Sequence, residues 1–137
     1  MTPEEQELVR YRLQRARETL DEAILLQEKR RLNAAVNRLY YACFYAVSAL
    51  LLTEGKSSSK HSGVRALFNV EWVKPGRVAS KYGRFYRRLY DSRQKGDYGD
   101  FVQFEDAEVT AWLQEARQFV GAVTTLVEKI IHEGGAG

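Results

Sequence analysis

The sequence predicts an all-α protein, an up-down four-helix bundle with one additional short helix. Three observations predict it: apolar residues recur at helical spacing, only 2 prolines interrupt 137 residues, and no segment carries a strand signal. Short connections between long helices favour the up-down arrangement. The length suits one domain, so we expect a single helical domain over residues 1–137 with a frayed tail at 133–137.

The first two predicted helices have clear beginnings and ends. The first runs from Met1 to about Lys29, with Thr2 as its N-cap and Pro3 in its first turn. The second runs from Leu32 to about Thr53 and is followed by Gly55, a residue that ends helices. It is apolar on nearly all sides, which places it at the centre of a bundle or in an oligomer interface.

A polar loop and a short helix follow. The loop covers residues 56–63 and contains three consecutive serines, one of which can cap a helix from about Lys60 to Asn69. The tripeptide Lys74-Pro75-Gly76 then predicts a turn.

Two longer helices complete the predicted bundle. One runs from Lys81 to about Gln94, with Ser80 as its cap and Gly96 at its end. A turn is expected at residues 97–100. The last helix runs from about Glu105 to His132, with acidic residues in its first turn.

Several classes of protein are excluded by composition. One cysteine, Cys43, rules out an internal disulfide framework and a cysteine-based zinc cage. The two histidines, His61 and His132, belong to no cluster with metal-ligand spacing, so we predict neither a metal nor a cofactor. The acidic N-terminus is unlike a signal peptide, and the longest apolar run, Ala49–Leu52, is too short to cross a bilayer. We therefore expect a cytoplasmic protein without a membrane partner.

The basic charge is concentrated in one segment. Between Trp72 and Lys95, 8 basic residues stand against one acid, whereas residues 96–137 are acidic overall. Aromatic residues alternate with these cations, a composition typical of surfaces that neutralise phosphate and stack bases. Alternatively, the aromatic residues form the core and the cations a solvated face. The candidate phosphate-binding residues are Arg38, Lys60, Arg84, Arg87, Arg88 and Lys95.

Two arginines are expected on inward-facing surfaces. Arg93 continues the helical stripe of Tyr82, Tyr86 and Tyr90, and a buried guanidinium requires a pairing partner or a bound anion. It either forms an anion site or pairs with an acid such as Asp97. Arg38 lies on an otherwise apolar helix, so its alternative role is an ion pair with a neighbouring helix.

Three motifs together resemble the HEPN domain family. They are Asn37-Arg38-Leu39-Tyr40-Tyr41-Ala42-Cys43-Phe44-Tyr45-Ala46, Ser59-Lys60-His61-Ser62-Gly63-Val64 and Arg93-Gln94-Lys95-Gly96-Asp97-Tyr98. The resemblance covers about residues 5–132 and is strongest to small stand-alone members that are paired with a minimal nucleotidyltransferase. It implies a bundle of four to five helices that forms a homodimer, with one basic motif from each subunit at a shared cleft.

The resemblance also implies an activity. Many members of the family are metal-independent ribonucleases of toxin–antitoxin or defence systems, with an arginine followed shortly by a histidine. Arg93 matches the arginine, but no histidine lies between Gln94 and His132, and Asp97 or Tyr98 stands there instead. Catalysis would then need either an Asp97 whose pKa is raised by burial, or His61 entering the cleft from its own loop or from the partner subunit. The alternative for His61 is a surface or capping role.

The tyrosine beside the basic motif has a further implied role. In paired family members the nucleotidyltransferase can modify such a tyrosine, and Tyr98 is the matching residue, with Tyr90 and Tyr86 as further candidates. The leading hypothesis is an RNA- or nucleotide-directed HEPN protein, with Arg93, Asp97, Tyr98 and His61 as the candidate catalytic residues. The alternatives are a non-catalytic nucleotide- or RNA-binding module, a docking partner of the nucleotidyltransferase, or a purely structural dimer.

Overall fold

The computed structural model describes the backbone of residues 1–98 and 102–136 and the side chains of residues 1–97 and 102–134. This part of the chain is helical and contains no strand, so the predicted all-α class is confirmed. The elements in chain order are α1 (Pro3–Glu28), α2 (Leu32–Leu52), α3 (His61–Phe68), the π-helix η1 (Asn69–Val73), α4 (Ser80–Tyr98) and α5 (Asp106–Ala136).

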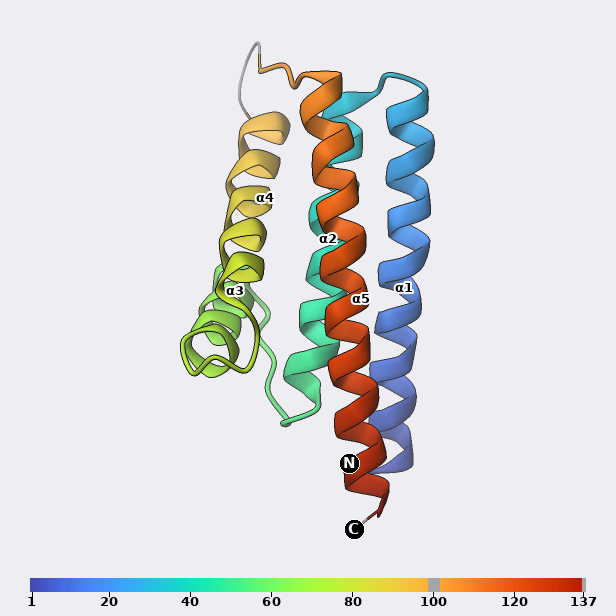
Figure 1. Ribbon diagram of the computed structural model, residues 1–137, viewed down its shortest axis with the longest axis vertical. Helices are drawn as coiled ribbons and strands as arrows, with labels where there is room; N and C mark the ends of the chain where they lie inside the picture. The colour runs from blue at the N-terminus through green and yellow to red at the C-terminus, as the bar shows by residue number, and fades with distance from the viewer. Residues whose placement is uncertain (99–101, 137) are drawn as a thin grey trace.

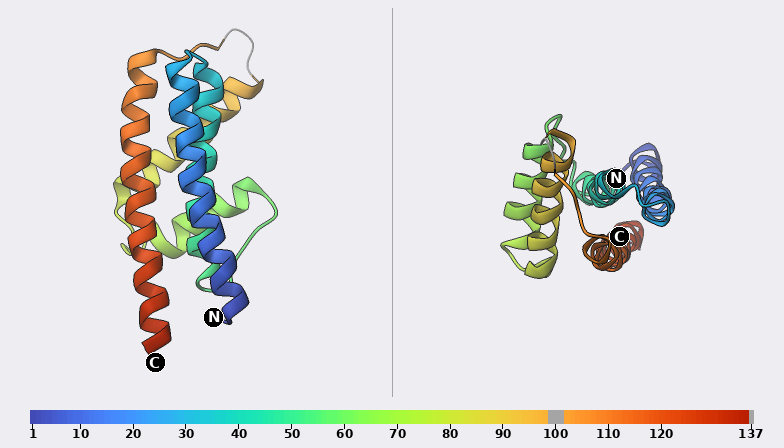
Figure 2. Two further views of the ribbon diagram at one scale, coloured as in Figure 1. Left: turned by 90° about the vertical axis from the view of Figure 1, so that its right-hand side faces the viewer. Right: turned by 90° about the horizontal axis from the view of Figure 1, so that it is seen from above.

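The four long helices alternate in direction, and both termini lie at the same end of the molecule (Figure 1). α1, α2 and α5 form a close group, while α4 and the short α3 lie on the other side of α2 (Figure 2). α2 packs against α1, α3, α4 and α5. The helix that the sequence predicts to be apolar on nearly all sides is therefore the central one.

Burial explains the unusual composition of α2. By length and mean hydropathy (1.3) it could span a membrane, but 67% of that window is buried inside the bundle. Leu39, Tyr40, Ala46 and Leu50 are completely buried. A helix surrounded by other helices needs apolar residues on every side, whether or not lipid is present.

Local signals place the beginning of α1 and two turns correctly. The Glu5 backbone N–H donates to Thr2 Oγ1 at 3.1 Å, so Thr2 caps the helix as predicted. Gly55 and Gly76 have φ values of +70° and +81°, which side-chain-bearing residues adopt at a cost. Both turns occur where the sequence predicts them.

The start of α3 differs from its prediction. Its N-cap is Lys60, which has no side-chain capping bond, so the expected serine cap is wrong. Ser58 Oγ instead accepts the Lys60 N–H at 3.2 Å and occupies the space that a Cβ at Gly63 would need. This contact holds the serine loop against the first turn of α3.

The end of α4 also differs. The helix continues through Gly96 to Tyr98, so Gly96 does not end it, and of the predicted turn at 97–100 the last two residues lie outside the described part. Gly96 allows a close contact between α4 and Phe104, because an added Cβ would lie only 3.0 Å from that ring. α5 likewise ends later than predicted, at Ala136.

Candidate functional site

Side chains from three helices meet on one face of the bundle. α2 contributes four residues, Asn37, Tyr40, Tyr41 and Phe44. Their spacing of three, one and three positions places them on the same side of the helix. α3 contributes its first residue, and α4 contributes two residues one turn apart near its end. We call this cluster the Arg93 site: Asn37, Tyr40, Tyr41, Phe44, His61, Arg93 and Asp97.

Arg93 is buried, as its place on the helical stripe predicts, with 8% of the residue exposed. Its Cζ lies 4.9 Å from the ring centroid of Tyr40 and 5.8 Å from that of Tyr41. Among the described residues its polar partner is Asp97, with a long Nη1–Oδ2 distance of 3.5 Å, and its buried Nε has none. A guanidinium has five N–H donors, so most of its hydrogen-bonding capacity is unused.

A polar network fixes the carboxylate beside this guanidinium. Asn37 Nδ2 donates to Asp97 Oδ2 at 3.0 Å, and Asn37 Oδ1 accepts from Nε and Nη2 of Arg38 at 3.1 and 2.7 Å. Arg38 also forms an ion pair with Glu22 of α1, with an N–O distance of 3.6 Å. The predicted ion pair of Arg38 with a neighbouring helix is present, and through Asn37 it connects to Asp97 and Arg93.

His61 lies at the first turn of α3 and is half-buried. Its ring stacks on Phe44 at a centroid distance of 4.6 Å, and its Nδ1 shares a 2.7 Å hydrogen bond with the Tyr40 hydroxyl. Burial, and secondly the charge of Arg93, lower the pKa of His61 below its ordinary value of 6.5. The imidazole is therefore neutral at neutral pH.

Tyr40 is the side chain that contacts both His61 and Arg93. It is completely buried, and burial raises its pKa to about 12, so its hydroxyl stays protonated. When the Tyr40 oxygen accepts the hydrogen bond from Nδ1–H of His61, Nε2 of the imidazole keeps its lone pair. The site then combines a neutral base with a cation that has free donors, which suits proton transfer on an anionic ligand.

The predicted basic face of α4 lies outside this cluster. Arg88 forms an ion pair with Glu115 of α5 at 3.6 Å, and Arg84 Nη1 donates to Ser80 Oγ at 3.3 Å. Both are exposed, as are the remaining candidate phosphate-binding residues Arg87, Lys95 and Lys60. The side chain of Tyr98 lies outside the described residues.

The aromatic residues of α4 belong mainly to the core. Tyr86 and Phe85 are buried, and Tyr86 stacks on Tyr40 at 5.9 Å and on Phe119 at 6.0 Å. This arrangement supports the alternative in which these rings form the core rather than a stacking surface. Within the described part of the chain, no three His, Cys, Asp or Glu side chains are grouped to hold a metal ion.

Comparison with known proteins gives the family. The HEPN domain matches residues 9–129. The chain belongs to the HEPN domain family. A UPF0332 protein of Thermotoga maritima is 50% identical to this HEPN chain over 93% of the chain and 96% of the relative. Two proteins of Methanocaldococcus jannaschii, both named "putative toxin", are 34% and 29% identical over 85% and 89% of the chain and 86% and 84% of the relatives.

The HEPN site contains residues that sequence reasoning did not assign to it. Tyr40 and Asn37 lie in the first of the three motifs, but neither was expected to be part of the site. A signal was present, because Asn37, Tyr40, Tyr41 and Phe44 follow the spacing of a single helix face. The distances across to His61 could not be read from that spacing.

Proposed function

We propose that this HEPN protein acts on RNA in a toxin-like system, and that its Arg93 site cleaves single-stranded RNA without a metal ion. The observation that carries the proposal is the placement of a neutral His61 imidazole and a buried Arg93 guanidinium on the same Tyr40 side chain. The family membership and the two relatives named "putative toxin" support it.

Each group has a defined task in the proposed reaction. Nε2 of His61 accepts the proton of a ribose 2′-OH, and the 2′-oxygen attacks the adjacent phosphorus. The bond from phosphorus to the 5′-oxygen breaks, giving a 2′,3′-cyclic phosphate and a 5′-oxygen that takes a proton from water, and the His61 imidazolium returns its proton to the hydroxide that remains. Free N–H donors of Arg93 stabilise the negative charge on the phosphoryl oxygens. Asp97 and Asn37 hold the guanidinium in position.

Cleavage of a labelled single-stranded RNA in the presence of EDTA tests this function. We expect wild-type protein to cleave it, and His61→Ala to lower the rate by about 10²- to 10⁴-fold, because the general base is lost. The matched control is His132→Ala, which replaces the other histidine, an exposed residue of α5. Intact RNA after incubation with wild-type protein would contradict the proposal, as would an equal loss in both variants.

The pH dependence follows from the direction of the His61 pKa shift. Protonated imidazole cannot accept a proton, so kcat/KM should fall as pH drops through this pKa, with a midpoint below 6.5. Because the Arg93 charge contributes to the lowered pKa, Arg93→Gln should move the His61 midpoint to higher pH. NMR titration of the imidazole resonances, assigned with His61→Ala, measures it. A midpoint above 6.5 in the wild-type protein would contradict the assignment.

A binding function without cleavage is the second candidate, and the missing motif histidine favours it. In that case RNA or a nucleotide contacts the exposed cations of α4, and binding weakens as salt rises. The same RNA would then bind without being cut, and Arg87→Glu would weaken binding. Binding that is indifferent to salt and to this substitution would contradict it.

Family membership also supports proposals for partners. We infer a homodimer and a minimal nucleotidyltransferase that modifies Tyr98. Light scattering should give twice the 15.8 kDa chain mass. Mass spectrometry after incubation with a nucleotidyltransferase and ATP should show a nucleotidyl group bonded to the Tyr98 oxygen, formed with release of pyrophosphate, and this adduct should be absent in Tyr98→Phe.

A further inference from the structure

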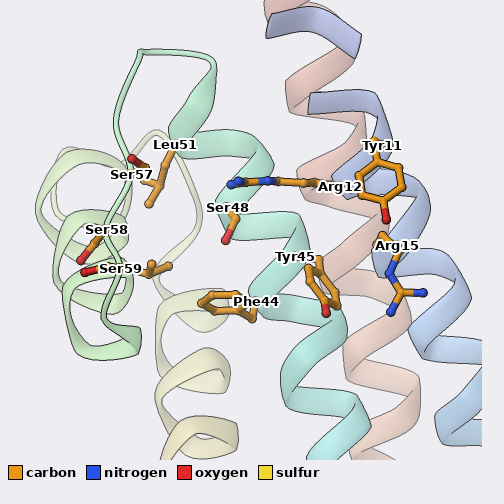
Figure 3. A pocket seen from close by; sticks show the side chains of 11 residues that line it. Tyr11, Arg12, Arg15, Phe44, Tyr45, Ser48, Leu51, Ser57, Ser58 and Ser59 are labelled. Atoms are coloured by element: carbon orange, nitrogen blue, oxygen red, sulfur yellow. The ribbon is translucent and has the colours of Figure 1, made fainter. Parts of the chain in front are cut away.

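A cavity of about 500 Å³ opens between α1, α2 and the serine loop, beside the Arg93 site. In Figure 3 the Arg12 side chain extends from α1 in the direction of this loop, and both Arg12 and Ser48 of α2 line the cavity. The volume lies within the range of small-molecule pockets. The lining side chains that matter are Arg12, Arg15, Phe44, Tyr45, Ser48 and the serines at 57–59.

The charge of the cavity is positive, because its lining contains two arginines and no carboxylate. Arg12 makes no ion pair with any described residue, and Arg15 donates from Nη1 to Glu18 at 3.0 Å, outside the lining. By contrast, the hollow beside Arg10 and Arg17 also contains two glutamates. An anion is therefore the ligand that the first cavity favours.

Hydroxyl groups complete the polar side of the cavity. Ser48 is 6% exposed and is one of the residues that line the cavity. Because Ser48 lines the cavity, its hydroxyl can donate a hydrogen bond to a ligand oxygen. The loop serines lie opposite in Figure 3, and the contact of Ser58 with Gly63 holds that wall in place.

An aromatic side chain connects the cavity to the Arg93 site. Phe44 lines the cavity and also stacks on His61, with ring centroids 4.6 Å apart. Tyr45 lines the same wall, and the Arg15 Cζ lies 5.3 Å from its ring centroid. Cations, hydroxyls and aromatic faces together match the phosphate, ribose and base of a nucleotide.

We propose that this cavity binds the nucleotide adjacent to the cleaved bond of single-stranded RNA, with its phosphate on Arg12 and Ser48 and its base against Phe44 or Tyr45. The inference rests on the proposed function and adds a substrate subsite to it. It accounts for how a single strand is held while His61 and Arg93 act on the neighbouring phosphodiester.

Binding of a short, fluorescently labelled 2′-O-methyl RNA tests the subsite, because this probe has no 2′-OH nucleophile and cannot be cleaved. We expect Arg12→Gln to weaken binding about tenfold, the effect of losing a hydrogen bond to a charged group. The slope of log K against log salt should also become shallower by about 0.7, the value for one phosphate contact on a single strand. Arg17→Gln, an exposed arginine of α1 outside this cavity, should leave both unchanged.

A second variant keeps the test independent of charge. Ser48→Leu fills the cavity and should weaken the same probe, with thermal melting used to verify that both variants are folded. Wild-type affinity in Arg12→Gln and Ser48→Leu would overturn the subsite, as would failure of the probe to bind the wild-type protein. The cleavage assay decides the proposed function separately, because it depends on His61 and Arg93 rather than on Arg12.

Discussion

Replacing Arg93 with glutamine should lower the rate of RNA cleavage by about 10²- to 10³-fold, the usual effect of removing a donor to a transition-state oxyanion. The guanidinium is held against Tyr40 and Tyr41, so its free N–H donors are already in place when phosphoryl charge develops. Glutamine retains an N–H donor but has neither the charge nor the forked geometry. Initial rates of cleavage of a labelled RNA measure the loss.

The fold should tolerate this substitution. The partner left behind, Asp97, remains partly exposed and hydrogen-bonded to Asn37, so the free energy of unfolding should change by only about 1 kcal/mol. The control for a lost positive charge is Arg117→Gln, which replaces an exposed arginine of α5. Cleavage by Arg93→Gln at the rate of this control would contradict a catalytic role for Arg93.

Replacing Phe119 with alanine should lower the free energy of unfolding by about 3–5 kcal/mol, the usual cost of deleting a buried aromatic ring. Phe119 is completely buried in α5 and contacts the rings of Phe68, Tyr82, Phe85 and Tyr86 at centroid distances of 5.6 to 6.2 Å. Its loss leaves a cavity between α5 and the pair formed by α3 and α4. Urea denaturation measures the change.

The same substitution bears on the site, because Tyr86 packs between Phe119 and Tyr40. Leu25→Ala is the control, since Leu25 is 61% exposed and should change stability by no more than about 0.5 kcal/mol. A loss in Phe119→Ala no larger than in this control would contradict the packing of α5 against α3 and α4.

The helices themselves could be predicted because their signals are local. The α2 prediction of Leu32 to about Thr53 agrees with Leu32–Leu52, and the cap at Thr2 forms as expected. The errors arose where a local signal has two meanings. Gly96 could end a helix or allow a close contact, and only the position of Phe104 shows that it does the second.

The candidate site was predictable only in part, for a similar reason. Helical periodicity placed Arg93 on the inward face, where it is buried. The hydrogen bond between Tyr40 and His61 joins residues 21 positions apart, and that between Asn37 and Asp97 joins residues 60 positions apart. No spacing rule along one helix reaches across such separations.

From its residues alone, this chain is determined to be an all-α HEPN bundle with an apolar central helix and an arginine turned towards it. Helical periodicity and helix caps depend on residues within a few positions of one another, so they can be recognised in the sequence. Whether His61 and Arg93 contact the same Tyr40 side chain depended on how the serine loop directs α3 against α2 and on the packing of α4 beside both. Those contacts are settled by the sum of many weak side-chain interactions between distant segments, and for that reason only the tertiary structure decided them.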